Sequence, residues 1–115
     1  VAEWHKDDDY NHDKYEWNIF LPLTRAQGTN TVWAESKPGK EDYTPMDAMP
    51  GDYYLWSGST LLHGNQLNDT GKSRVSIDFR VMPLSKYKEN NRISTSNHTK
   101  MTLGHYWVKI HEEQK

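Results

Sequence analysis

The sequence contains no cysteine, which excludes disulfides, thiolate catalysis and cysteine-ligated zinc or iron–sulfur sites. Any metal site must therefore use histidine, aspartate or glutamate. The chain also has no apolar run near the ~18 residues that a membrane-spanning helix needs. It shows no signal-peptide pattern at its start. We therefore expect no membrane partner and a cytoplasmic location.

A strong excess of charge of either sign is absent too. The 115 residues include 14 basic and 16 acidic side chains, for a net charge of −2. No basic face is implied, which argues against nucleic acid as a partner. Hydrophobic residues make up only 34% of the chain, but five Trp and seven Tyr supply large buried areas from few residues. We expect one domain over residues 1–115 with a small core.

Short β-rich runs, separated by Gly, Pro, Asn and Asp, fill most of the chain, and helical periodicity is weak throughout. Several short strands with turn signals between them are typical of an all-β sandwich or barrel. The predicted strands cover residues 15–23, 31–35, 52–56, 60–63, 73–82 and 104–111.

The run 73–82 alternates between apolar and polar residues with the two-residue period of a strand. Its apolar face must be covered by another part of the structure. Its polar face either lines a wet interior or meets solvent. The apolar face carries Val75, Ile77, Phe79 and Val81, and the polar face carries Arg74, Ser76, Asp78 and Arg80.

Two long stretches are predicted to be loops. Residues 36–51 are rich in proline and glycine, and residues 85–102 are almost wholly polar. Loops of this length are uncommon in compact domains and tend to be functional lids or disordered segments. We expect residues 85–102 to be one or the other.

Three residues form a candidate metal site. His5 and Asp7 are separated by one residue, so on a strand both side chains would point to the same face. His63, from a distant strand, would complete a set of two histidines and one carboxylate. Such a set leaves coordination positions open and suits non-haem Fe(II), where oxygen and a co-substrate must both reach the iron. A calcium loop over residues 7–13 lacks the glycine that its sixth position requires, since His12 is there.

Arg74 and Ser76 form a candidate carboxylate site. Arg74 lies eleven residues after His63 and shares a strand face with Ser76. The planar guanidinium offers paired donors that match a carboxylate. A serine two residues further along the strand can add a hydroxyl hydrogen bond to the same carboxylate.

In this order and spacing, the sequence resembles the Fe(II)/2-oxoglutarate-dependent oxygenases, and among them the phytanoyl-CoA dioxygenase-like group. In that group the distal segment runs from a Gly-Asp strand through a Leu-His-Gly turn and an Asn-x-Thr/Ser loop to a basic strand. The similarity covers roughly residues 4–83. The corresponding residues here are Gly51-Asp52, Leu62-His63-Gly64, Asn68-Asp69-Thr70 and Arg74-Val75-Ser76.

The resemblance implies a double-stranded β-helix, or jelly roll, truncated at the N-terminus relative to the family. It implies Fe(II) bound by His5, Asp7 and His63, and 2-oxoglutarate bound by Arg74 with help from Ser76. It further implies a dioxygenase that hydroxylates a small-molecule substrate.

Two further expectations follow from the resemblance. The family's usual N-terminal part, which covers one sheet, has no counterpart before His5, so we expect a homo-oligomer if the chain is complete. Side chains near the expected site are candidates for lining a substrate pocket: Trp17, Asn18, Tyr54, Trp56 and Asn65.

Two other interpretations remain open. One is a cupin-like metal-binding barrel, which a requirement for 2-oxoglutarate would distinguish from the oxygenase. The other is a non-catalytic β-sandwich binding module whose Trp and Tyr side chains stack on sugars. The binding module predicts that His5 lies far from His63.

Overall fold

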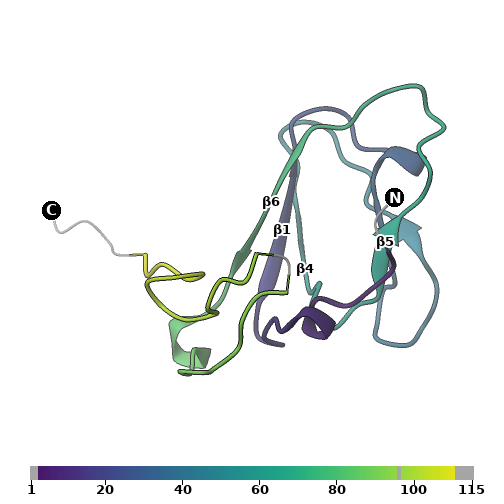
Figure 1. The fold of residues 1–115 in the computed structure, drawn as a ribbon. Helices are drawn as coiled ribbons and strands as arrows, with labels where there is room; N and C mark the ends of the chain where they lie inside the picture. Colours follow the sequence, from purple (N-terminus) through teal and green to yellow (C-terminus); the bar gives the residue numbers. More distant parts are fainter. Residues whose placement is uncertain (1–2, 96, 111–115) are drawn as a thin grey trace, which may run out of the picture.

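The computed structural model describes residues 3–95 and 97–110 (Figure 1). Over these residues the chain forms six short strands in two antiparallel sheets, and its helical elements are single 3₁₀ turns. The all-β prediction is therefore confirmed. Within the same residues there is no helix of sufficient length and apolar character to cross a membrane.

The first sheet has the order β4-β1-β6 and contains the two longest strands, which run side by side in Figure 1. Ile19, at its centre, lies opposite Leu55 on one side and Phe79 on the other. The strands are β1 (Trp17–Pro22), β4 (Tyr54–Trp56) and β6 (Ser76–Val81).

The second sheet has the order β3-β2-β5, and its short strand β3 lies inside the stretch 36–51 that we predicted as a loop. Its strands are β2 (Val32–Ala34), β3 (Thr44–Pro45) and β5 (His63–Asn65). The 3₁₀ turns are η1 (Asp7–Tyr10), η2 (Gly28–Asn30) and η3 (Leu84–Lys86).

The core is built from apolar side chains of both sheets and their connections. Along β1 the even-numbered residues are buried, whereas Trp17 at its start is exposed. This alternation is the expected pattern of a strand with one buried face. The cluster consists of Phe20, Ala26, Val32, Ala34, Met46 and Trp56.

Phe20 and Phe79 are the two phenylalanines of the chain, and they allow a direct test of this core. Phe20 is 0% exposed and Phe79 is 42% exposed. We expect Phe20→Ala to lower the free energy of unfolding by about 3–5 kcal/mol. Phe79→Ala should cost less than about half of that, because much of its ring already meets water. Urea denaturation of the two variants measures the difference, and equal losses would contradict the assignment of the core.

The other face of the first sheet is apolar and open to solvent. We call it the outer face. Trp17, Leu55, Ile77 and Phe79 are between 42% and 55% exposed, and no charged residue occupies an outward position on these strands. In the described structure the apolar face predicted for strand 73–82 is therefore uncovered. The outer face consists of Trp17, Ile19, Leu21, Leu55, Ile77, Phe79 and Val81.

Two predicted strands were wrong. Residues 58–60 form a turn, and the strand predicted at 60–63 begins only at His63 and continues to Asn65. The strand predicted at 104–111 is absent over residues 104–110, where the chain turns back in an isolated bridge between Leu103 and Trp107. An apolar alternation makes a strand only if a partner strand is available, and no strand pairs with this segment. Residue 111 lies outside the described residues.

The polar segment 85–102 is irregular after η3 but packs against the body of the protein at two places. Met101 is 2% exposed and Ser94 is 4% exposed. Arg92 donates a 2.9 Å hydrogen bond to the carboxylate of Asp13, at the other end of the chain. The role of this segment as a lid stays a prediction.

Candidate metal centre

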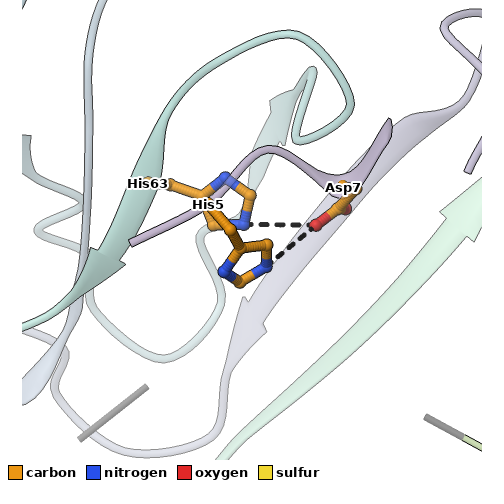
Figure 2. A group of neighbouring side chains, drawn as sticks. All are labelled: His5, Asp7 and His63. Carbon is orange, nitrogen blue, oxygen red and sulfur yellow. Dashed lines mark ion pairs between the residues drawn. The ribbon is translucent and has the colours of Figure 1, made fainter. Parts of the chain in front are cut away.

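The two histidines are placed side by side by a short stretch of antiparallel pairing. The backbone N–H of His5 donates to the carbonyl of His63 at 2.9 Å, and the N–H of His63 donates to the carbonyl of His5 at 3.0 Å. Directly opposed residues in such a pair project their side chains to the same face. The ring centroids are accordingly 4.5 Å apart (Figure 2).

Asp7 reaches the same point from a different local structure than we predicted. We expected His5 and Asp7 on one strand, but Asp7 begins the 3₁₀ turn η1, and its N–H donates to the carbonyl of Gly58 at 2.8 Å. This turn directs the carboxylate inward, where Asp7 is 2% exposed. Asp7 Oδ1 lies 3.3 Å from Nε2 of His5 and 3.3 Å from Nε2 of His63 (Figure 2).

Both imidazole rings are oriented by their second nitrogen. Nδ1 of His5 donates to the carbonyl of Glu3 at 2.7 Å, and Nδ1 of His63 donates to the carbonyl of Leu61 at 2.8 Å. A carbonyl oxygen only accepts, so in each ring Nδ1 carries the hydrogen. Nε2 is then the atom that can bind a metal, and in both rings it faces Asp7. Bonds of this kind from the far nitrogen are typical of metal-binding histidines.

The other carboxylate oxygen of Asp7 is held by protein donors. Arg80 donates to Oδ2 from Nη2 at 2.9 Å and from Nε at 3.3 Å, and the Asn18 amide donates to it at 2.9 Å. Burial alone would raise the pKa of Asp7. The hydrogen bonds from His63 and Asn18 and the positive charge of Arg80 outweigh it and hold the pKa far below its usual value. Asp7 is therefore a carboxylate at neutral pH.

The structure brings Arg74 and Ser76 together as the sequence predicts. Arg74 Nη1 donates to Ser76 Oγ, and Nε donates to the carbonyl of Asn30 at 2.6 Å. The guanidinium also lies over the ring of Phe20, with its central carbon 5.2 Å from the centroid. Among the described residues Arg74 forms no ion pair. Its charge is thus available to a carboxylate that enters the site.

Asp78 lies between the carboxylate site and the metal site, and sequence reasoning gave it no role. It lies directly opposite Phe20 in the register of β1 and β6 and so shares a sheet face with Phe20, but it remains exposed to solvent. Partial removal from water, reinforced by the nearby charge of Asp7, raises its pKa, although the cations Arg80 and Arg74 oppose the shift. Of the two aspartates Asp7 and Asp78, Asp78 is therefore the one that takes up a proton more easily.

Arg80 was placed on the polar face of its strand but was not recognised as part of the site. The available signal was its spacing of six residues from Arg74, which puts both on one strand face. Its contact with Asp7 joins residues 73 positions apart, which no local pattern indicates.

The five predicted pocket residues have different positions. Asn18 is buried and binds Asp7 rather than lining an open pocket. Trp56 is buried with its ring edge-on to His63, at 4.7 Å between centroids, and its Nε1 is a buried donor without a partner in the described part of the chain. Asn65 borders an open depression of about 320 Å³ that also includes Arg74. The hydroxyl of Tyr54 donates to the carbonyl of Asp47 at 2.9 Å. The fifth candidate, Trp17, points outward.

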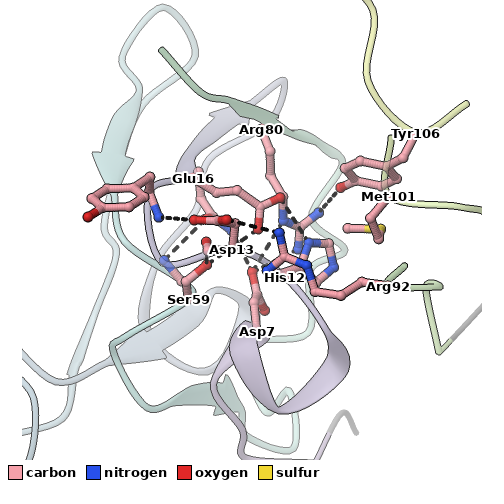
Figure 3. Close-up of polar contacts among 12 residues, drawn as sticks. Asp7, His12, Asp13, Glu16, Ser59, Arg80, Arg92, Met101 and Tyr106 are labelled. Atoms are coloured by element: carbon pink, nitrogen blue, oxygen red, sulfur yellow. Dashed lines mark hydrogen bonds and ion pairs between the residues drawn. The ribbon is translucent and has the colours of Figure 1, made fainter. Parts of the chain in front are cut away.

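A polar network connects the metal site to the C-terminal segment (Figure 3). Arg80 Nη1 donates to the hydroxyl of Tyr106 at 3.4 Å. The buried carboxylate of Glu16 pairs with His12 Nδ1 at 3.0 Å, and Ser59 Oγ donates to the carbonyl of Asp13 at 2.7 Å. These contacts attach residues from both ends of the chain to the walls of the site.

The chain is similar to the streptomycin biosynthesis protein StrG of Streptomyces griseus, with 43% identity over 110 residues. The match covers 96% of this chain and 52% of StrG, so the chain spans about half the length of the curated relative that it matches. No family model matches the sequence, and no solved structure matches the chain.

Proposed function

We propose that the chain is an Fe(II)- and 2-oxoglutarate-dependent dioxygenase of the phytanoyl-CoA dioxygenase-like kind, and that its two sheets are part of a double-stranded β-helix. The proposal depends on one observation above all. Two Nε2 atoms, each fixed by a hydrogen bond from its own Nδ1, converge on one oxygen of the buried Asp7. Two imidazoles and one carboxylate on one face of an octahedral ion leave the opposite face open.

The spacing of the donor atoms fits a metal ion of this size. Metal–ligand bonds of about 2.0–2.2 Å at right angles place neighbouring ligand atoms about 3 Å apart. The two distances from Asp7 Oδ1 are 3.3 Å, and all three candidate ligand atoms lie within 4.8 Å of one another. Small side-chain movements would bring His5, Asp7 and His63 onto one ion.

Arg74 and Ser76 support 2-oxoglutarate as the second ligand. A dicarboxylate that chelates the ion through one end needs a cation at its other end. Arg74 has this role in the proposal, because its guanidinium is half-buried, forms no ion pair among the described residues and is steadied by Asn30 and Ser76. A paired hydrogen bond to a carboxylate is strong in such a partly dry setting.

Fe(II) and 2-oxoglutarate, when bound, supply the oxidising chemistry, and the chain's residues supply orientation. His5, Asp7 and His63 would hold the ion, and Arg74 would orient the co-substrate. The ring of Trp56 packs edge-on to His63, and its buried Nε1, which has no partner among the described residues, is a donor left free for a bound ligand. The buried ring of Phe20 packs against the guanidinium of Arg74 and so ties the carboxylate site to the core.

The substrate is proposed to be a small molecule. The name of StrG assigns that protein to the biosynthesis of streptomycin, a small-molecule product. Because the identity is 43% over nearly the whole of this chain, we propose that the chain has a related role in the biosynthesis of a small molecule. The net charge of −2 also gives no support to a nucleic-acid substrate.

The structure bears differently on the two rival interpretations. The binding module required His5 to lie far from His63, and their rings are instead 4.5 Å apart, which weighs against it. A cupin-like metal-binding barrel would share the metal site. Arg74 and Ser76 favour the oxygenase over the cupin, because a cupin has no need of a second carboxylate site.

Anaerobic titration with Fe(II) and 2-oxoglutarate tests the proposal. We expect the parent chain to develop the weak visible metal-to-ligand charge-transfer band of an iron-bound 2-oxoacid. His63→Ala should abolish the band, because it removes one of three protein ligands. His105→Ala is the matched control, since His105 is exposed and is not one of the three candidate ligands, and it should retain the band.

Each negative result has a distinct meaning. A folded parent that binds the metal without any band would reject 2-oxoglutarate and leave the cupin-like barrel. A parent that binds no divalent metal would reject the metal centre itself.

A further inference from the structure

The two oxygens of Asp7 have sharply different surroundings. Oδ1 faces the Nε2 atoms of His5 and His63. Oδ2 accepts three hydrogen bonds, two from Arg80 and one from Asn18. An oxygen that already accepts three donors has little capacity left for a metal ion on the other side.

Gly58 and Asn18 complete the enclosure of Oδ2. The N–H of Gly58 donates to Asn18 Oδ1 at 3.1 Å, which turns the amide so that its Nδ2 faces Asp7. A Cβ at position 58 would lie 2.7 Å from Asp7 Oδ2 and 2.6 Å from Asn18 Nδ2, so the backbone can approach this closely only as glycine. Oδ2 is thus packed as well as hydrogen-bonded.

We propose that Arg80, together with Asn18, is a positioning residue that restricts Asp7 to one-oxygen coordination of the metal. This inference rests on the proposed metal centre. A carboxylate free to rotate can bind an ion through both oxygens and occupy an additional coordination position. The Arg80–Asn18 clamp on Oδ2 prevents this and keeps the whole open face of the ion for co-substrate and oxygen.

The clamp is itself supported from the C-terminal segment. Arg80 Nη1 donates to Tyr106 Oη, while Nη2 and Nε engage Asp7. Three of its nitrogens therefore have fixed partners, which limits rotation of the side chain.

The test counts the waters on a bound Mn(II) ion, with no 2-oxoglutarate present. Mn(II) increases the relaxation rate of water protons in proportion to the number of exchangeable waters that it carries. One-oxygen coordination by Asp7 leaves three of six positions to water, and two-oxygen coordination leaves two. We expect the relaxivity of Mn(II)-loaded Arg80→Met to fall by roughly one third relative to the parent. Asn18→Leu removes the third hydrogen-bond donor to Asp7 Oδ2, so it should also lower the relaxivity.

Two controls separate this effect from general disturbance. Arg92→Met removes an arginine with the same 2.9 Å bond from Nη2 to an aspartate, at Asp13 outside the metal site, and should leave the relaxivity unchanged. Arg80→Lys keeps a cation that can reach Oδ2 and should restore most of the parent value.

The failures are distinguishable. A parent that binds Mn(II) and an Arg80→Met variant with equal or higher relaxivity would overturn the clamp alone. If Arg80→Met does not fold, Asn18→Leu and Arg80→Lys decide by the same readout, and parent-like relaxivity in Asn18→Leu overturns the clamp. A parent without Mn(II) binding would overturn the clamp and the proposed metal centre together.

Discussion

Replacing Arg74 by methionine is expected to weaken binding of 2-oxoglutarate by about 30-fold or more while leaving the affinity for the metal unchanged. Removing one partner of a buried, hydrogen-bonded charge pair costs roughly 2–5 kcal/mol, which corresponds to at least this factor in Kd. The metal should not respond, because His5, Asp7 and His63 do not contact Arg74 in the described hydrogen bonds and ion pairs. Anaerobic titration of the metal-free protein with Fe(II) gives the metal affinity, and titration of the Fe(II)-loaded protein with 2-oxoglutarate gives the Kd of the co-substrate.

The Arg74→Lys variant tests whether binding of 2-oxoglutarate needs only a positive charge at position 74 or also the planar guanidinium. Arg74→Lys keeps the cation but loses the planar fork and the simultaneous bonds to Asn30 and Ser76. Its affinity for 2-oxoglutarate should therefore lie between that of the parent and that of Arg74→Met. Arg25→Met removes an exposed arginine and serves as the control for net charge.

Two outcomes would reject the role of Arg74 in binding 2-oxoglutarate. If Arg74→Met and Arg25→Met bind 2-oxoglutarate as tightly as the parent, Arg74 does not hold the co-substrate. If Arg74→Met also loses the metal, its effect is on the fold of the site rather than on a carboxylate. Retention of metal binding with loss of 2-oxoglutarate binding is the pattern that the structure leads us to expect.

The residues of this candidate site that could be predicted from the sequence are those whose placement follows from their spacing along the chain. The two-residue period predicted that Arg74 and Ser76 share a strand face, and the structure places them in contact. The grouping of His5, Asp7 and His63 came from residue chemistry combined with the order of the family's motif. Both predictions hold even when a strand boundary is misplaced by a residue or two, because each depends only on which side chains face inward.

Local structure at Asp7 was predicted wrongly for a physical reason. A His-x-Asp pair on a strand and a histidine followed by a 3₁₀ turn both direct the two side chains toward one point. The run Asp7-Asp8-Asp9 favours the turn, since aspartates near the start of a helical turn can accept its free N–H groups, as Asp9 does for Lys6. The chemistry of the site was therefore easier to predict than the backbone that presents it.

The clamp on Asp7 could not be predicted from spacing at all. Arg80 and Asn18 meet because the register of β1 and β6 places them directly opposite each other. That register depends on which residues of the two strands pair, and a shift by one residue would turn Arg80 away from the interior. Contacts of this kind follow from the complete fold.

Ile77→Lys is expected to abolish self-association of the 115-residue chain. The outer face of the β4-β1-β6 sheet measures roughly 20 by 15 Å from strand length and spacing. A patch of this size is comparable to the largest apolar patches of monomeric proteins, which often mark interaction sites. Ile77 is 47% exposed on this face, and a lysine there would place a charge within any interface that covers it.

We propose that a second copy of the chain covers the outer face when the protein is purified by itself. The face carries no charge at its outward positions, and the net charge of −2 gives little repulsion between copies. Two such faces can pack as the sheets of a β-sandwich do, about 10 Å apart. In a two-fold symmetric pair each substitution occurs twice, so Ile77→Lys would place two like charges in one interface.

Sedimentation velocity over a concentration series measures the outcome. The parent should shift from monomer toward dimer as its concentration rises, because a face of this area is small for a stable interface. Ile77→Lys should stay monomeric throughout. Val108→Lys is the matched control, since Val108 is 80% exposed but lies in the C-terminal segment outside the outer face, and it should associate like the parent. A monomeric parent at every concentration, or a dimer that Ile77→Lys leaves intact, would show that this face does not join two copies.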